Sequence, residues 1–224
     1  MSSLDPRFLD RLSPDLDDLT TISTISEYRG QQQLYVKQSP DILESLRTFA
    51  SIESTDASNR IEGVTAPEAR IKDLVAKKTQ PRDRSEQEIA GYRDALELIH
   101  QNGEDMPVKV NVVLQLHNML YRYFNADGGQ WKVVDNDIVE KDAAGNTVRV
   151  RFKPVTAVAT PQAMEDLVSN YHQAQKDQRL PLIVIPLFIL DFLCIHPFRD
   201  GNGRVSRLLT LQLLYHAGYE VGRY

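Results

Sequence analysis

Residues 182–195 form the stretch that constrains the fold most, because nearly all of their side chains are apolar. A helix that is hydrophobic all round has to be covered by other elements. The stretch is too short to span a bilayer, and Pro186 and Asp191 interrupt it. We therefore expect a central core helix in a soluble protein.

The next twelve residues, 196–207, read His-Pro-Phe-Arg-Asp-Gly-Asn-Gly-Arg-Val-Ser-Arg, and an amphipathic pattern follows over 204–217. This arrangement predicts a loop between two helices. The first N–H groups of a helix lack internal partners and lie at the positive end of its dipole, so we expect the start of the second helix to bind an anion. Gly201 and Gly203 would let a phosphate reach the backbone.

Four polar side chains of this run complete a site for phosphoryl chemistry. Arg204 and Arg207 are three residues apart and lie on nearly the same helix face, where they can bind phosphate oxygens. Asp200 offers a hard oxygen ligand for Mg²⁺, and His196 is a natural general base. An isolated Gly-Asn-Gly is usually only a turn, but the combination of base, metal ligand, phosphate cradle and two cations favours a catalytic site.

The run resembles, at every position, the Fic (Fido) family signature His-Pro-Phe-x-Asp/Glu-Gly-Asn-Gly-Arg-x-x-Arg. The resemblance implies that His196 deprotonates a target hydroxyl and that Asp200 holds Mg²⁺. It implies further contacts to the nucleotide and to the core: Gly201, Asn202 and Gly203 form the anion hole, Arg204 binds the β- and γ-phosphates, Arg207 holds the γ-phosphate and Phe198 anchors the loop. A sister branch that phosphorylates its target carries lysine in place of Gly203, so this glycine favours nucleotide transfer.

A second motif lies near the end of a helical pattern that starts at residue 41 and is expected to stop at Gly63. Ser58 and Glu62 are four apart and share a helix face. A lone glutamate usually faces solvent. Beside the signature, however, Ser58-x-x-x-Glu62-Gly63 resembles the family's inhibitory pattern Ser/Thr-x-x-x-Glu-Gly/Asn, which implies that Glu62 takes Arg207 from the γ-phosphate.

The chain contains one β-hairpin pattern. Val148, Val150 and Phe152 alternate with polar residues, residues 131–140 supply a partner arm, and 143–146 supply a turn. An isolated hairpin is as often a surface decoration. The resemblance implies instead a flap that borders the active site and pairs with a strand of the target.

The remaining segments predict a helical domain. Helices are expected over about 65–78, 85–99, 110–124 and from Thr160, with Thr65 and Ser85 opening the first two. Residues 1–39, in which 20–26 lean toward β-structure, are expected to form an N-terminal extension. The predicted fold class is all-α, a Fic-like helical domain at 40–224 that includes an inhibitory helix at about 51–63 and the flap hairpin at about 130–153.

The charge of the chain limits its expected binding partners, and its cysteine content indicates the cellular compartment. The formal net charge is -5 and no Lys/Arg stripe lies outside the signature, so nucleic acid and anionic membranes are not expected partners. The single cysteine, Cys194, excludes an internal disulfide and fits a reducing cytoplasm. Residues 1–18 lack the apolar core of a signal peptide. We expect a cytoplasmic protein.

These observations and the resemblance predict a protein adenylyltransferase, which transfers AMP from MgATP to a Ser, Thr or Tyr hydroxyl of a target protein and is autoinhibited by Glu62. Two alternatives stay open: removal of AMP from a modified protein, with Glu62 orienting water, and a shortened, weakly active paralog that acts as a binding partner. Similar proteins are often longer than this chain, which favours the paralog, whereas the intact run at 196–207 argues against it. Modification of a second copy of the chain and formation of a homodimer are further alternatives that the sequence leaves open.

Overall fold

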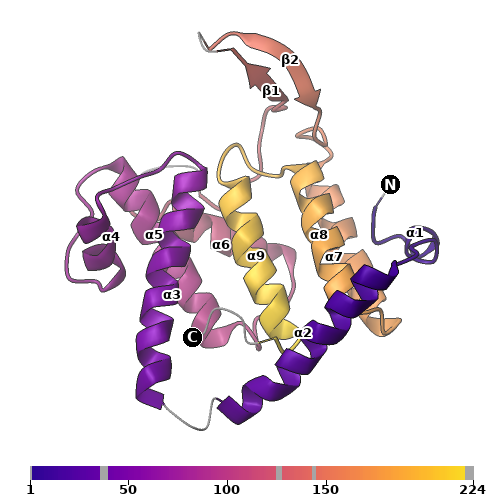
Figure 1. Cartoon of the computed structure of the whole chain (residues 1–224). Coiled ribbons are helices and arrows are strands. Elements are labelled where there is room, and N and C mark those ends of the chain that lie inside the picture. Colours follow the sequence, from indigo (N-terminus) through magenta and orange to yellow (C-terminus); the bar gives the residue numbers. More distant parts are fainter. Residues whose placement is uncertain (1, 36–39, 125–127, 143–144, 220–224) are drawn as a thin grey trace.

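The computed structural model describes residues 2–35, 40–124, 128–142 and 145–219. These residues form helices and one two-stranded hairpin (Figure 1), so the all-α fold class with a single hairpin is confirmed. In the described part of the chain, no helix is long and apolar enough to cross a membrane.

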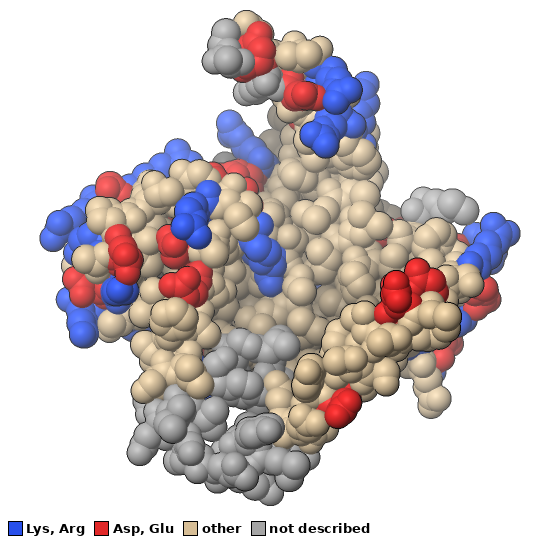
Figure 2. Space-filling view, viewed as in Figure 1, with Lys and Arg blue, Asp and Glu red and all other residues tan. Residues whose placement is uncertain are grey.

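Helix α8 (Pro181–Ile195) occupies the centre of one half of the fold, packed between α7 (Thr160–Lys176) and α9 (Asn202–His216). Its buried residues include Phe188 and Phe192, both fully covered. The expectation of a fully covered helix is wrong on one side, because Leu190 is 50% exposed. Figure 2 shows a surface largely without charged side chains over α8 and α9.

Helix α5 (Arg84–Asn102) is the centre of the other half. It packs against α3 (Pro40–Ile61), α4 (Glu68–Val75), α6 (Val110–Leu120) and α9. A Cβ on Gly91 would lie 2.3 Å from the Leu120 carbonyl oxygen, so the crossing of α5 and α6 requires glycine.

Two predicted helix caps are wrong. Asp83, not Ser85, caps α5, because its carboxylate accepts the Glu86 N–H at 2.9 Å. Helix α4 starts after Pro67 without a side-chain cap, so Thr65 does not open it. Helix α3 confirms the predicted helix before Gly63, and two of its large apolar side chains, Leu46 and Phe49, are exposed.

The hairpin projects from the helical body (Figure 1). Strand β1 (Ile138–Lys141) pairs antiparallel with β2 (Thr147–Phe152), with two register irregularities. The first arm was expected from residue 131, but the strand starts later because residues 132 and 136 bond to the signature loop instead. Part of the expected turn, 143–144, lies outside the described residues.

The N-terminal residues are helical rather than β-leaning. Helix α1 (Pro6–Leu9) precedes α2 (Leu16–Tyr35), in which Thr20, Thr24 and Ser26 each donate a hydroxyl hydrogen bond to the carbonyl four residues earlier. The β-branched residues of this segment predicted extended structure. Within a helix, however, threonine hydroxyl groups can bond to the preceding turn, so these residues do not exclude a helix. Leu4 is buried in the main core, so the first residues pack onto the domain, while a boundary at residue 39 stays a prediction.

Candidate active site

The signature loop begins where α8 ends. His196 caps α8 in the left-handed region (φ 51°), which is uncommon for a residue other than glycine and often marks a functional site. Gly201, with φ 80°, precedes α9. The Asn202 side chain closes the loop, since its Oδ1 accepts the Phe198 N–H at 2.9 Å and its Nδ2 donates to the Phe198 carbonyl at 2.8 Å. Any contact of Asn202 with an anion would therefore come from its backbone N–H.

Phe198 fixes the loop in the core. Its ring is fully buried and stacks on His117, with the centroids 3.7 Å apart, while Trp131 stacks at 5.3 Å. In the sequence, His117 is marked only by its place on an apolar helix face. Its Nδ1 accepts the Gly129 N–H at 2.9 Å, so Nε2 carries the proton and donates to the Asp200 carbonyl at 3.1 Å. Burial lowers the pKa of His117 to about 4, which keeps the ring neutral.

His196 is prepared to accept a proton. Burial, followed by the nearby Lys132 charge, lowers its pKa, so the imidazole is neutral near pH 7. The Leu193 backbone opposes this shift. A neutral imidazole keeps one ring nitrogen without a proton, which can act as an acceptor. The geometry thus suits general-base chemistry.

Lys132 supports the loop from behind and was not singled out in the sequence. Its ammonium is buried and donates to the Ile195 carbonyl at 3.1 Å and to Asn136 Oδ1 at 3.0 Å. Its backbone N–H donates to the Pro197 carbonyl at 2.9 Å, and the Asn136 amide donates to the Phe198 carbonyl at 3.1 Å. The base of the hairpin and the signature loop are therefore joined by hydrogen bonds.

The Glu62 carboxylate lies beside the first turn of α9, where the sequence predicts an anion site. A Cβ on Gly203 would lie 2.2 Å from Glu62 Oε1 and 3.2 Å from Arg207 Nη1. Because position 203 is glycine, the Glu62 carboxylate can occupy the space above the first turn, and a larger residue would displace this side chain. A negative charge is favoured in this position by the helix dipole.

Arg207 joins the two sequence motifs. Its Nη2 donates to Glu62 Oε1 at 2.7 Å and to the Ser58 carbonyl at 2.9 Å, and its Nε donates to Ser58 Oγ at 2.7 Å. Ser58 is buried, whereas the side chains of Glu62 and Arg207 are each 31% exposed. Residues 145 positions apart thus meet in one ion pair.

Arg204 points into the protein, away from Arg207. Its guanidinium is 1% exposed, and Nη1 donates to Glu88 Oε2 at 2.5 Å while Nη2 donates to the Tyr121 hydroxyl at 3.2 Å. Residues three apart on a helix differ by about 60° in direction, which is enough here to place one arginine against α5 and the other against α3. The two expected phosphate ligands do not share a partner in this structure.

Asp200 is exposed and faces open space. Its Oδ1 accepts the Gly201 N–H at 2.7 Å, and its side chain is 61% exposed. It lines an open cavity of about 810 Å³ together with residues 130–136 at the hairpin base, Arg84, Arg199, His117 and Tyr121. The described residues contain no group of three His, Cys, Asp or Glu that could hold a metal by themselves. One carboxylate does fit Mg²⁺, which usually takes one or two carboxylates and completes its shell with phosphate oxygens and water.

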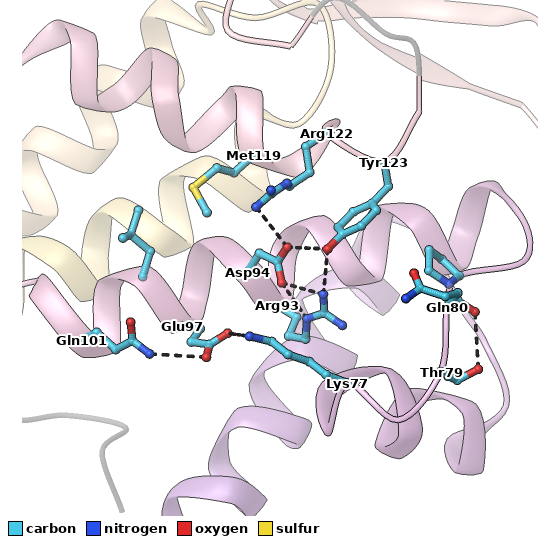
Figure 3. A pocket seen from close by; sticks show the side chains of 12 residues that line it. Lys77, Thr79, Gln80, Arg93, Asp94, Glu97, Gln101, Met119, Arg122 and Tyr123 are labelled. Atoms are coloured by element: carbon cyan, nitrogen blue, oxygen red, sulfur yellow. Dashed lines mark hydrogen bonds and ion pairs between the residues drawn. The ribbon is translucent and has the colours of Figure 1, made fainter.

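A second cleft, of about 410 Å³, lies between α5, the end of α6 and the α4–α5 connection (Figure 3). Its charges pair with one another: the Asp94 carboxylate accepts from Arg93, Arg122 and Tyr123, and Lys77 pairs with Glu97 at 2.6 Å. The cleft shares no lining residue with the cavity beside Asp200. We assign it a structural role.

Comparisons with known proteins agree with this geometry. The Fic/DOC family model matches residues 107–214. A Fic domain-containing signaling protein from Bacteroides thetaiotaomicron superposes with a TM-score of 0.73 at 24% identity, over 88% of this chain and 74% of that one. A Fic family protein from Desulfovibrio desulfuricans gives 0.70 at 22% identity over 92% and 59% of the two chains, and a fragment of Fic-1 from C. elegans gives 0.69 at 18% over 90% and 58%.

The chain therefore spans between 58% and 74% of the length of these three solved proteins. No curated protein matches it significantly. At these identities the solved structures establish the fold, and the family model adds the match over the signature loop itself. Residues 107–214 of this chain therefore form a domain of the Fic/DOC family.

Proposed function

We propose that this protein is an adenylyltransferase that moves AMP from ATP to a Ser, Thr or Tyr hydroxyl of a target protein. Fic family members are generally transferases. The observation that carries the proposal is the carboxylate of Glu62 on the first turn of α9, paired with Arg207. An anion is already favoured there, next to a loop whose histidine is neutral, and a phosphate group could take the same place.

The reaction follows from the groups in the loop. The target oxygen attacks the α-phosphorus, its proton passes to the free ring nitrogen of His196, and the bond from the α-phosphorus to the bridging oxygen breaks as pyrophosphate leaves. The backbone N–H groups of the first turn of α9 and the Arg207 guanidinium stabilise the negative charge on the phosphates. Asp200 would hold Mg²⁺, which when bound neutralises further phosphate charge.

We propose that Glu62 keeps the resting enzyme slow. Its carboxylate occupies Arg207 and the space above Gly203, so ATP has to displace it before the polyphosphate can lie along the loop. The same position favours a second candidate function, the removal of AMP from a modified protein. Glu62 is 31% exposed, so water can reach the carboxylate and could be oriented by it.

Intact-mass spectrometry tests the proposal. The wild type, Glu62→Gly and Glu62→Gly with His196→Ala are incubated with each magnesium nucleoside triphosphate, alone and with candidate target proteins. We expect an AMP adduct that forms fastest in Glu62→Gly and is absent from the double variant. Loss of AMP from a modified protein, without any adduct from ATP, would favour the second candidate. If no folded variant forms an adduct from ATP or removes AMP from a modified protein, both candidates would be overturned and a binding partner would be favoured.

A further inference from the structure

We infer that Glu88, which lies on α5 and outside both sequence motifs, is a positioning residue: it binds Arg204 more closely than Asp200 does and so leaves the Asp200 carboxylate available for Mg²⁺. This inference rests on the proposed function, in which Asp200 is the Mg²⁺ ligand. In this inference Arg204 supports the signature loop. The family signature implies instead that Arg204 binds phosphate.

The guanidinium of Arg204 is nearly sealed from water. Its side chain is 1% exposed, and Nε has no hydrogen-bond partner among the described residues. A buried cation of this kind is strongly unfavourable unless a carboxylate compensates it. Two carboxylates of the described residues pair with it: Glu88 Oε2 at 2.5 Å and Asp200 Oδ2 at 3.6 Å.

Glu88 is the stronger of these partners. Its side chain is 5% exposed against 61% for Asp200, and a charge pair interacts more strongly at short distance and away from water. Arg84, from the rim of the cavity, also pairs with Glu88 at 2.9 Å. Because Glu88 compensates Arg204 from the buried side, Arg204 does not need Asp200 as its main counter-ion, and the Asp200 carboxylate stays available at the cavity.

Removal of the Glu88 charge would change this balance. Arg204 would then have Asp200 as the remaining carboxylate partner in the described part of the chain, and the 3.6 Å contact would tighten into an ion pair. That pair would compete with Mg²⁺ for the same oxygens. If Arg204 were also changed to an uncharged side chain, the competition would end.

The experiment measures the Mg²⁺ dependence of ATP binding by isothermal titration calorimetry. All variants carry Glu62→Gly and His196→Ala, so that the anion site is open and ATP is not consumed. We expect Glu88→Gln to raise the Mg²⁺ concentration for half-maximal ATP binding by about tenfold, since a new charge pair of about 1.4 kcal/mol competes with the metal. ATP affinity at saturating Mg²⁺ should stay within about twofold, a change below about 0.5 kcal/mol.

The double change Glu88→Gln with Arg204→Met should return the Mg²⁺ requirement to that of the parent. It removes a buried ion pair as a unit, which proteins often tolerate, so it is also the variant to use if Glu88→Gln does not fold. Glu86→Gln is the matched control, because Glu86 lies on the same helix, is equally buried and pairs with Arg70 at 2.6 Å, without a contact to the signature loop. It should lower the melting temperature and leave the Mg²⁺ requirement unchanged.

Three outcomes would overturn the inference. The first is an unchanged Mg²⁺ requirement in folded Glu88→Gln. The second is a loss of ATP affinity of about tenfold or more at saturating Mg²⁺ in the double variant, which would make Arg204 a phosphate ligand. The third is a parent that binds ATP equally with and without Mg²⁺, which would refute the proposed function of Asp200 as well, whereas the first two leave that function intact.

Discussion

Glu62→Gly should activate the enzyme. The change removes the 2.7 Å ion pair with Arg207 and clears the space above Gly203, while both Ser58 contacts of Arg207 remain. Glu62 follows the last residue of α3, so a glycine there does not interrupt the helix. The fold should therefore persist, and the anion site should be open to the γ-phosphate.

The size of the effect follows from the exposure of the pair. A hydrogen bond between charged groups contributes about 1.5–3 kcal/mol when protected from water, and an exposed ion pair contributes less than about 1 kcal/mol. Glu62 and Arg207 are each 31% exposed, which places their pair between these limits. A barrier lowered by about 1.4 kcal/mol corresponds to about a tenfold faster reaction. We expect the initial rate of AMP transfer to rise by at least about tenfold.

The assay follows the AMP adduct by intact mass at saturating MgATP. Asp56→Ala is the matched control, because it removes the ion pair of Asp56 with Arg60 at 3.7 Å on the same helix, without a contact to Arg207. It should not activate, and His196→Ala should silence the Glu62→Gly variant. A folded Glu62→Gly protein that is no faster than the wild type would refute autoinhibition, and a parallel loss of AMP removal would make Glu62 a catalytic residue of the reverse reaction.

Three further predictions concern the signature loop and its support. His196→Ala should abolish transfer and leave the ATP dissociation constant within about twofold by calorimetry, because the base is needed for chemistry and not for phosphate binding; transfer at the parent rate would exclude His196 as the base. Asp200→Ala should remove activity together with its Mg²⁺ dependence, and an unchanged Mg²⁺ titration would contradict the assignment. His117 has a folded pKa of about 4 against its usual 6.5, so the unfolded chain binds more protons between these values and stability should fall as pH drops through this window. The loss should reach up to about 3 kcal/mol in urea titrations at pH 7 and pH 4 and be smaller in His117→Gln, and an equal loss in both proteins would exclude His117 as its source.

The sequence predicted correctly those parts of the fold and site whose residues are neighbours in the chain. The helices around the signature loop were predicted because their apolar side chains repeat with helical spacing, and the loop was found because its chemistry is contiguous in the chain. The same reasoning failed at α2, where β-branched residues favoured a strand. The sequence also placed the N-cap of α5 two residues too late. Asp83 and Ser85 are both favourable N-cap residues, and the backbone conformation that selects Asp83 is visible only in the structure.

The parts that were missed depend on contacts between distant segments. Lys132 looks like an ordinary residue of an irregular arm until its ammonium is seen against the Ile195 carbonyl. Glu88 is one of several acidic residues at the start of a helix, and its burial against Arg204 depends on how α5 crosses α9. The outward direction of Arg207 and the inward direction of Arg204 likewise require the tertiary packing, because their spacing alone places them on similar faces.

The hydrogen bonds between the hairpin base and the signature loop make the two a single mechanical unit. The Lys132 N–H holds the Pro197 carbonyl, and the Asn136 amide holds the Phe198 carbonyl. A force that tilts the projecting hairpin is therefore transmitted within one or two bonds to the backbone that carries His196. These bonds reach the two residues next after His196 in the chain, so a displacement of the hairpin base would also displace the backbone beside the proposed catalytic base.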